Sequence, residues 1–179
     1  MRCKKVVTML PLDSPRWSEL DAFFGDSEQV PIVLTKWIDA IGFDQERTIY
    51  ERGLYQLFLH QGTITNVAFA VIPWIVEYCQ HAEIPNRIEY IADVALVELN
   101  RLTRGVHYVR DDGDTEPAWL MADYMHAIEQ AQTIAENLMD EAVHEERRSH
   151  LWRMMPALFG NAELAQQRRS QPGPRNELP

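Results

Sequence analysis

The chain is short of positive charge and of long apolar runs, and each shortage argues against a class of protein. Its 179 residues include 17 Lys and Arg against 27 Asp and Glu, a formal net charge of −10. A nucleic-acid binder needs clustered Lys and Arg for its phosphate contacts. No stretch approaches the roughly 18 apolar residues of a membrane span, and the N-terminal apolar run is too short for a signal peptide. We therefore expect a cytoplasmic protein that binds neither nucleic acid nor membrane.

Cysteine is scarce as well, because only Cys3 and Cys79 occur and they lie far apart in the sequence. Small proteins that rely on disulfides carry more, so a disulfide scaffold is not expected. Cys79 lies in an apolar run that we expect to be a buried helix, where a free thiol acts as a small apolar side chain. Both observations favour a reducing compartment.

The sequence also lacks the common catalytic motifs. It has no glycine-rich phosphate loop, no nucleophile elbow, and no HExxH or CxxC pattern. His144 and His150 are six residues apart and do not share a helix face, so no metal pair is expected. Asp140 lies one turn before His144, but such a charged run is more typical of a solvated helix face. We therefore predict that the protein is not an enzyme and holds no cofactor and no metal.

Helix signals recur along most of the chain, whereas strand signals are few. Ser14 and Pro15 start one predicted helix and Gly25 ends it. Asp44 caps a later helix. Residues 87–103 have the clearest amphipathic pattern, with apolar residues at steps of three and four. These residues are Ile88, Ile91, Ala92, Ala95, Leu96, Leu99 and Leu102.

These segments predict an all-α protein of about seven helices with short connections. The helices pair along the sequence, which favours an irregular stack of HEAT-like helical hairpins over a symmetric four-helix bundle. Residues 1–160 form the single predicted domain. Residues 161–179 contain several Arg, Pro and Gly, and we expect them to be a flexible basic tail. The predicted pairs are 45–60 with 64–80, and 87–103 with 117–138.

Residues 54–79, LYQLFLHQGTITNVAFAVIPWIVEYC, contain two apolar segments joined by the corner His-Gln-Gly-Thr. We expect Gly62 to take the left-handed conformation that ends one helix. Thr63 or Thr65 then caps the next helix, which Pro73 kinks. A ligand site at the corner is the alternative, but no nucleophile or carboxylate lies at a suitable spacing. The predicted structural corner consists of His60, Gln61, Gly62, Thr63 and Pro73.

The same pattern, followed over residues 46–103, resembles a group of bacterial proteins with HEAT-like helical repeats. In that group an aliphatic helix ends in His-Gln-Gly-Thr, and an Ala-rich helix with an internal Pro follows. Similar all-helical folds serve as immunity proteins beside secreted toxins. The resemblance therefore implies stacked helical hairpins and a cognate toxin as partner.

The acidic run DDGDTE at residues 111–116 is a candidate contact element. It lacks the residue order of a calcium loop and the bidentate Glu that such a loop ends on. A solvated acidic loop is the plain interpretation. The functional alternative is a docking element for a basic surface, such as the cleft of a nuclease.

Tryptophan is the second candidate feature, with five in the chain. Trp37 and Trp74 lie beside the apolar stripes, and we expect them to pack. Trp17, Trp119 and Trp152 lie near predicted helix ends, where aromatic side chains can supply contacts to a partner. The predicted partner-binding residues are Asp111, Asp112, Asp114, Glu116, Trp119 and Trp152.

Together these features predict a non-catalytic immunity protein that neutralises a secreted bacterial toxin, such as a nuclease effector, by direct occlusion. The acidic composition suits a toxin with a basic active-site surface. The alternative is a helical-repeat scaffold or regulatory module that binds a peptide or protein in an exposed apolar groove. An enzyme is a third interpretation. It requires a deep pocket with several titratable groups of perturbed pKa, using His60 or His144.

Overall fold

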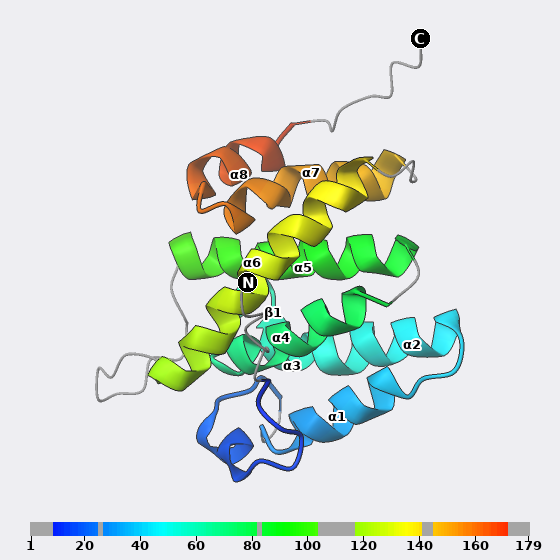
Figure 1. Cartoon of the computed structure of the whole chain (residues 1–179), viewed down its shortest axis with the longest axis vertical. Coiled ribbons are helices and arrows are strands. Elements are labelled where there is room, and N and C mark those ends of the chain that lie inside the picture. Colours follow the sequence, from blue (N-terminus) through cyan, green and yellow to red (C-terminus); the bar gives the residue numbers. More distant parts are fainter. Residues whose placement is uncertain (1–8, 25–26, 82–83, 104–116, 141–144, 172–179) are drawn as a thin grey trace, which may run out of the picture.

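The computed structural model describes residues 9–24, 27–81, 84–103, 117–140 and 145–171 (Figure 1). Most of these residues lie in helices, and the two strands contain two residues each, so the predicted all-α class is confirmed. The elements are η1 (Pro15–Glu19, a 3-10 helix), α1 (Gln29–Ile38), α2 (Phe43–Ile49), η2 (Tyr50–Leu54, a π-helix), α3 (Tyr55–Phe58), β1 (Leu59–His60), β2 (Thr63–Ile64), α4 (Val67–Cys79), α5 (Ile84–Thr103), α6 (Ala118–Asp140), α7 (Glu145–Leu158) and α8 (Ala162–Arg169).

The longer helices form two rows. α5 packs extensively on α7, and α4 packs on α6, while helices adjacent in the sequence also touch. This alternation is the packing expected of stacked hairpins, because each hairpin lies on the preceding one helix by helix. In Figure 1, α2, α5 and α7 lie one above another along the long axis and α6 crosses α5 obliquely. We call α2–η2–α3, α5 and α7 the first row, and α4 and α6 the second row, while α8 packs on α7.

The core lies between and within these rows. Ten of the 13 residues of α4 are buried, which explains why its sequence is apolar on every side. The stripe predicted for residues 87–103 is buried in α5 except at its edges, where Leu96 is half-buried and Leu102 is exposed. Pro73 lies in the interior of α4, and the helix continues past it to Cys79.

The His-Gln-Gly-Thr corner has a different local structure from the predicted one. α3 ends at Phe58, before the corner, and the next residues form an antiparallel hairpin in which His60 pairs with Thr63. Gln61 and Gly62 have φ values of 50° and 74°, as in the two-residue turns that close β-hairpins. No Thr caps α4, whose N-cap is Asn66. The corner therefore joins two helices through a hairpin turn, not through a helix stop followed by a cap.

Gly62→Ala is expected to lower the free energy of unfolding by about 1–2 kcal/mol, because a left-handed conformation costs an L-residue roughly that amount. Gln61→Gly is the matched control, since it gives glycine to the other left-handed position. Urea denaturation of both variants measures the effect. A Gly62→Ala variant as stable as the wild-type protein would contradict the turn.

The N-terminal segment is less helical than predicted. Ser14 does cap a helix, accepting a hydrogen bond from the Arg16 backbone N–H at 3.3 Å, but this 3-10 helix ends at Glu19. Trp17, which the sequence placed on a possible contact surface, is 1% exposed. Its Nε1 donates to the Pro11 carbonyl at 2.9 Å. Trp17 therefore belongs to the core.

The predicted tail starts too early, because its first part is helical. α8 packs on α7, and Asn161 caps it by accepting a hydrogen bond from the Leu164 backbone N–H at 3.0 Å. Ala165 is buried against the stack. Pro156 does not end α7, which runs two residues further to Leu158.

Candidate functional site

The partner-binding residues predicted from the sequence are only partly placed. Asp111, Asp112, Asp114 and Glu116 lie outside the described residues. Trp119 and Trp152 are both half-buried, and each ring is covered by a guanidinium group. Arg16 lies 4.8 Å from the centre of the Trp119 ring, and Arg168 lies 4.3 Å from that of Trp152. The two tryptophans pack against different elements, η1 and α8, so they do not form one surface.

The corner histidine has no catalytic surroundings. His60 packs edge-on against Phe24 at 4.5 Å between ring centres, and its Nδ1 lies 3.2 Å from Gln56 Oε1. Among the described residues, no three His, Cys, Asp or Glu side chains are grouped so that they could hold a metal ion. His144 lies outside the described residues. The structure thus places an aromatic ring and an amide beside His60, and the interpretation that uses His144 stays a prediction.

A different site is formed where the first row brings distant segments together. A pocket of about 280 Å³ lies between α2, η2, α3 and α5, with one residue from α7 at its edge. We call it the acidic–tyrosine pocket. Its lining residues are Arg47, Tyr50, Glu51, Tyr55, Gln56, Glu89, Tyr90, Asp93 and His150.

The π-helix η2 positions one wall of this pocket. In η2 the backbone N–H of Tyr55 bonds to the carbonyl of Tyr50, five residues earlier, which adds one residue to the turn. A Cβ at Gly53 would lie 3.1 Å from Val33 Cγ1, so α1 packs closely on η2 at that point. π-turns within helices are frequent at functional sites, because they shift the side chains that follow.

Asp93 on α5 is the central acidic group of the pocket. Tyr50 Oη donates a hydrogen bond to Asp93 Oδ2 at 3.1 Å. Burial raises the pKa of Asp93 to about 7, partly offset by the Tyr50 hydrogen bond, and Glu89 and Glu51 raise it further. Asp93 is therefore a carboxyl group that exchanges its proton near neutral pH.

The tyrosines of the pocket remain protonated at neutral pH. Burial raises the pKa of Tyr55 to about 12, with a further contribution from Asp93. Burial likewise raises the pKa values of Tyr50 and Tyr90. The Tyr50 ring lies 4.3 Å from that of Tyr90 and 6.2 Å from that of Tyr55, between ring centres. The tyrosines thus supply neutral hydroxyl groups and aromatic surface.

Charges at the rim of the pocket are predominantly negative. Arg47 Nε pairs with Glu51 Oε1 at 2.6 Å, but both side chains are largely exposed and such a pair contributes little stability. His150 extends from α7, and burial together with Arg153 and Arg169 lowers its pKa. Near neutral pH the pocket therefore combines three carboxyl groups with one cation that is already paired.

A buried network next to the pocket holds Tyr50 and Tyr90, the two tyrosines that we call the floor of the pocket. Glu46 is 6% exposed and accepts hydrogen bonds from Tyr90 Oη at 2.6 Å and from Asn86 Nδ2. Trp37 is fully buried and packs on the rings of Tyr50 and Tyr90. These contacts tie α1, α2 and α5 together and hold the tyrosines in place.

The sequence did not identify the acidic–tyrosine pocket. The available signals were two spacings, Glu46 with Tyr50 and Glu89 with Asp93, each of which puts two polar side chains on one helix face. Nothing in those spacings indicates that the two faces meet. Their meeting depends on the packing of η2 against α5, 43 residues apart at the Tyr50–Asp93 contact.

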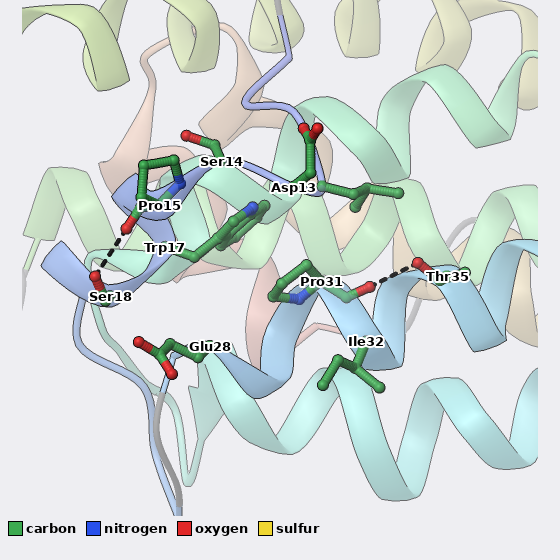
Figure 2. A pocket seen from close by; sticks show the side chains of 10 residues that line it. Asp13, Ser14, Pro15, Trp17, Ser18, Glu28, Pro31, Ile32 and Thr35 are labelled. Carbon is green, nitrogen blue, oxygen red and sulfur yellow. Dashed lines mark hydrogen bonds between the residues drawn. The ribbon is translucent and has the colours of Figure 1, made fainter.

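A second hollow, of about 390 Å³, lies between η1 and α1 (Figure 2). Trp17 and the ring of Pro31 line it. The hydroxyl groups of Ser18 and Thr35 donate to backbone carbonyls of their own helices, at 2.7 and 2.8 Å. These two hydroxyl groups are therefore not free to bind a ligand, which makes the hollow a weaker candidate for a site.

Comparisons of the chain with protein-family models, with curated proteins and with solved structures find no match. Within the described residues, no helix is both long enough and apolar enough to cross a membrane.

Proposed function

We propose that the protein is a non-catalytic binding protein that recognises a basic protein partner through the acidic–tyrosine pocket. We further propose that this partner is a secreted bacterial toxin, which the protein occludes as an immunity protein does. The observation that carries the proposal is the pocket itself, in which Glu51, Glu89 and Asp93 gather around tyrosine side chains in a chain of net charge −10.

The position of the pocket supports a binding role. Its lining residues come from α2–η2–α3, α5 and α7, the three successive members of the first row. Stacked helical repeats use such rows as extended binding surfaces, because side chains of successive repeats are presented side by side. A partner at the pocket would therefore contact several hairpins at once.

The charge of the chain supports a basic partner. A net charge of −10 attracts a positively charged surface over a distance of about 8 Å at physiological salt, and this attraction speeds association. Enzymes that cut nucleic acids carry basic clefts, because their substrates are polyanions. An acidic surface that fills such a cleft blocks the substrate without any chemistry of its own.

The toxin as partner rests on the sequence resemblance over residues 46–103. The scaffold alternative requires a continuous apolar groove. In the described part of the chain, the exposed large apolar side chains are distributed over separate elements from Phe24 to Phe159. That distribution favours recognition by charge over recognition of an apolar peptide.

Charge reversal in the pocket provides the test. Glu51→Lys is expected to weaken binding to the cognate toxin by at least about tenfold, because one carboxylate is replaced by a cation facing a basic surface. Growth on co-expression with the toxin, and dissociation constants at two salt concentrations, measure the effect. Glu136→Lys is the matched control, since Glu136 is exposed on α6, which does not line the pocket. Absence of binding and protection by the wild-type protein would overturn the proposal.

A further inference from the structure

Asp93 is the carboxyl group of the pocket that contacts Tyr50. It accepts one hydrogen bond, from Tyr50 Oη to its Oδ2. Among the described residues it has no ion-pair partner, whereas Glu98, further along the same helix, pairs through both oxygens with Arg101 at 2.6 and 2.7 Å. Glu98 is thus paired with a cation, whereas Asp93 lines a cavity and has no ion-pair partner among the described residues.

We propose that the acidic–tyrosine pocket is a binding site for a guanidinium group, and that an arginine side chain of the basic partner enters it to pair with Asp93. The inference rests on the proposed function in one respect, that the arginine belongs to that partner. The recognition of a guanidinium group by the pocket can be measured without the partner.

The size of the pocket fits a side chain better than a larger ligand. Its volume of about 280 Å³ lies below the range of roughly 300–1,000 Å³ that is usual for small-molecule and cofactor sites. It is bounded by segments of three successive members of the first row and open to solvent at Glu51, whose side chain is 52% exposed. One long side chain from a docked protein can therefore reach Asp93 from the rim.

The acceptors in the pocket favour guanidinium over ammonium. The lining carboxyl groups come from two elements, Glu51 from η2 and both Glu89 and Asp93 from α5, so a cation with donors in several directions can reach more than one of them. Arginine has five N–H donors in a planar group that also stacks on aromatic rings, and Tyr55 offers a half-buried ring at the wall. A lysine ammonium group is compact, more strongly hydrated and does not stack in this way.

The hydroxyl groups of the floor are compatible with a cation. The Tyr50 hydroxyl donates a hydrogen bond to Asp93, and the Tyr90 hydroxyl donates one to Glu46. Their oxygen lone pairs therefore remain available, and no hydroxyl proton needs to point at the bound cation. The buried Glu46 network keeps Tyr90 in this orientation.

The pairing makes binding depend on pH. A guanidinium group binds the deprotonated form of Asp93, whose pKa is about 7 in the free protein. The other groups that face Asp93 are Tyr50 and Glu51 from η2, Tyr55 from α3, Glu89 from α5, Arg47 from α2 and His150 from α7. The Cys79 thiol on α4 also interacts with Asp93, and burial raises its pKa, so it stays protonated near neutral pH. Of these groups His150 also titrates, and its lowered pKa keeps it neutral until the pH falls below the usual range for histidine.

The experiment uses the full chain and two uncharged-backbone probes, N-acetyl-arginine N-methylamide and its lysine counterpart. Their binding is followed by NMR titration of backbone amides. We expect saturable shifts around η2 and α5 with the arginine probe and weaker binding of the lysine probe. Affinity for the arginine probe should be about tenfold higher at pH 8 than at pH 6, because Asp93 must lose its proton first.

Four variants separate the contributions. Asp93→Asn should weaken binding of the arginine probe at least about tenfold at pH 8 and remove most of the pH dependence. Tyr55→Leu should reduce the preference for arginine over lysine. His150→Gln should leave most of the pH dependence in place, and Glu136→Gln should bind as the wild-type protein does. Thermal unfolding of each variant establishes that it is folded.

The outcomes keep this inference apart from the proposed function. The guanidinium site is overturned if the pocket amides show no saturable chemical-shift change at tens of millimolar arginine probe. It is also overturned if Asp93→Asn binds the probe as tightly as the wild-type protein does. Toxin protection that survives Asp93→Asn also overturns it, while leaving the binding function intact. Specific binding of the arginine probe without any protection from the toxin supports the guanidinium site and overturns the proposed function.

Discussion

Asp93→Asn is expected to raise the free energy of unfolding at pH 8 by about 2–4 kcal/mol. The pKa of Asp93 is about 7 in the folded protein, against an ordinary value of 3.8. Between these values the folded chain holds a proton that the unfolded chain has lost, so stability falls as the pH rises from about 4 to about 7. Asparagine carries no charge at any pH and can still accept the hydrogen bond from Tyr50, so it avoids this loss.

Urea denaturation at several pH values measures the difference between the two proteins. We expect the wild-type protein and Asp93→Asn to have similar stability near pH 4 and to diverge up to pH 8, with the variant more stable. A variant that is less stable at pH 8 would contradict the cost assigned to a half-buried carboxylate that has no cation partner among the described residues. Glu136→Asn serves as the control, because Glu136 is exposed and its removal should not change the slope.

Trp37→Ala is expected to lower the free energy of unfolding by about 3–5 kcal/mol, the usual cost of emptying a large buried aromatic site. Trp37 is fully buried and its ring lies 4.2 Å from Tyr78, 5.4 Å from Tyr90 and 5.6 Å from Tyr50, between ring centres. One side chain on α1 thus joins η2, α4 and α5. Its loss leaves the floor of the acidic–tyrosine pocket without support.

Chemical denaturation measures the stability of this variant, and Trp152→Ala is the matched control. Trp152 is half-buried beneath Arg168, so its removal should cost only about 1 kcal/mol. Losses of the same size in the two variants would contradict the central position of Trp37. Binding of the arginine probe should also weaken in Trp37→Ala, because Tyr50 and Tyr90 lose the ring that positions them.

The first of these effects bears on why the pocket exists. A buried carboxylate without a cation lowers stability near neutral pH, and an amide of the same shape would not. Residues that lower stability in this way are typical of functional sites, where the missing partner comes from the ligand. In Asp93→Asn, the expected gain in stability and the expected loss of probe binding have the same cause. Both result from removing a carboxylate that has no cation partner among the described residues of the free protein.

Much of the fold could be predicted from the sequence. The stripe from Ile88 to Leu99 has helical spacing and is buried in α5, and Trp37 packs as its place beside an apolar stripe indicated. The alternation of short connections and amphipathic segments predicted stacked hairpins. These features are local, because each is encoded within one helix and its caps.

The features that could not be predicted from the sequence depend on contacts between segments that are far apart in the chain. The hairpin turn at Gln61–Gly62 needs two left-handed residues, and glutamine gives no signal for that conformation where asparagine would. The π-helix lies where α1 approaches closely at Gly53, a contact between separate segments that has no local signal in the sequence. The acidic–tyrosine pocket depends on the contact between Tyr50 on η2 and Asp93 on α5, 43 residues later in the chain.

The row arrangement has a mechanical consequence for the stack. An array of hairpins bends at the joints between neighbours, so its curvature varies while each hairpin stays rigid. The acidic–tyrosine pocket is lined by α2–η2–α3, α5 and α7, and therefore spans two successive joints. An arginine side chain bound in the pocket would contact helices on both sides of each joint. We therefore expect the first row to be more rigid when the pocket is occupied than when it is free.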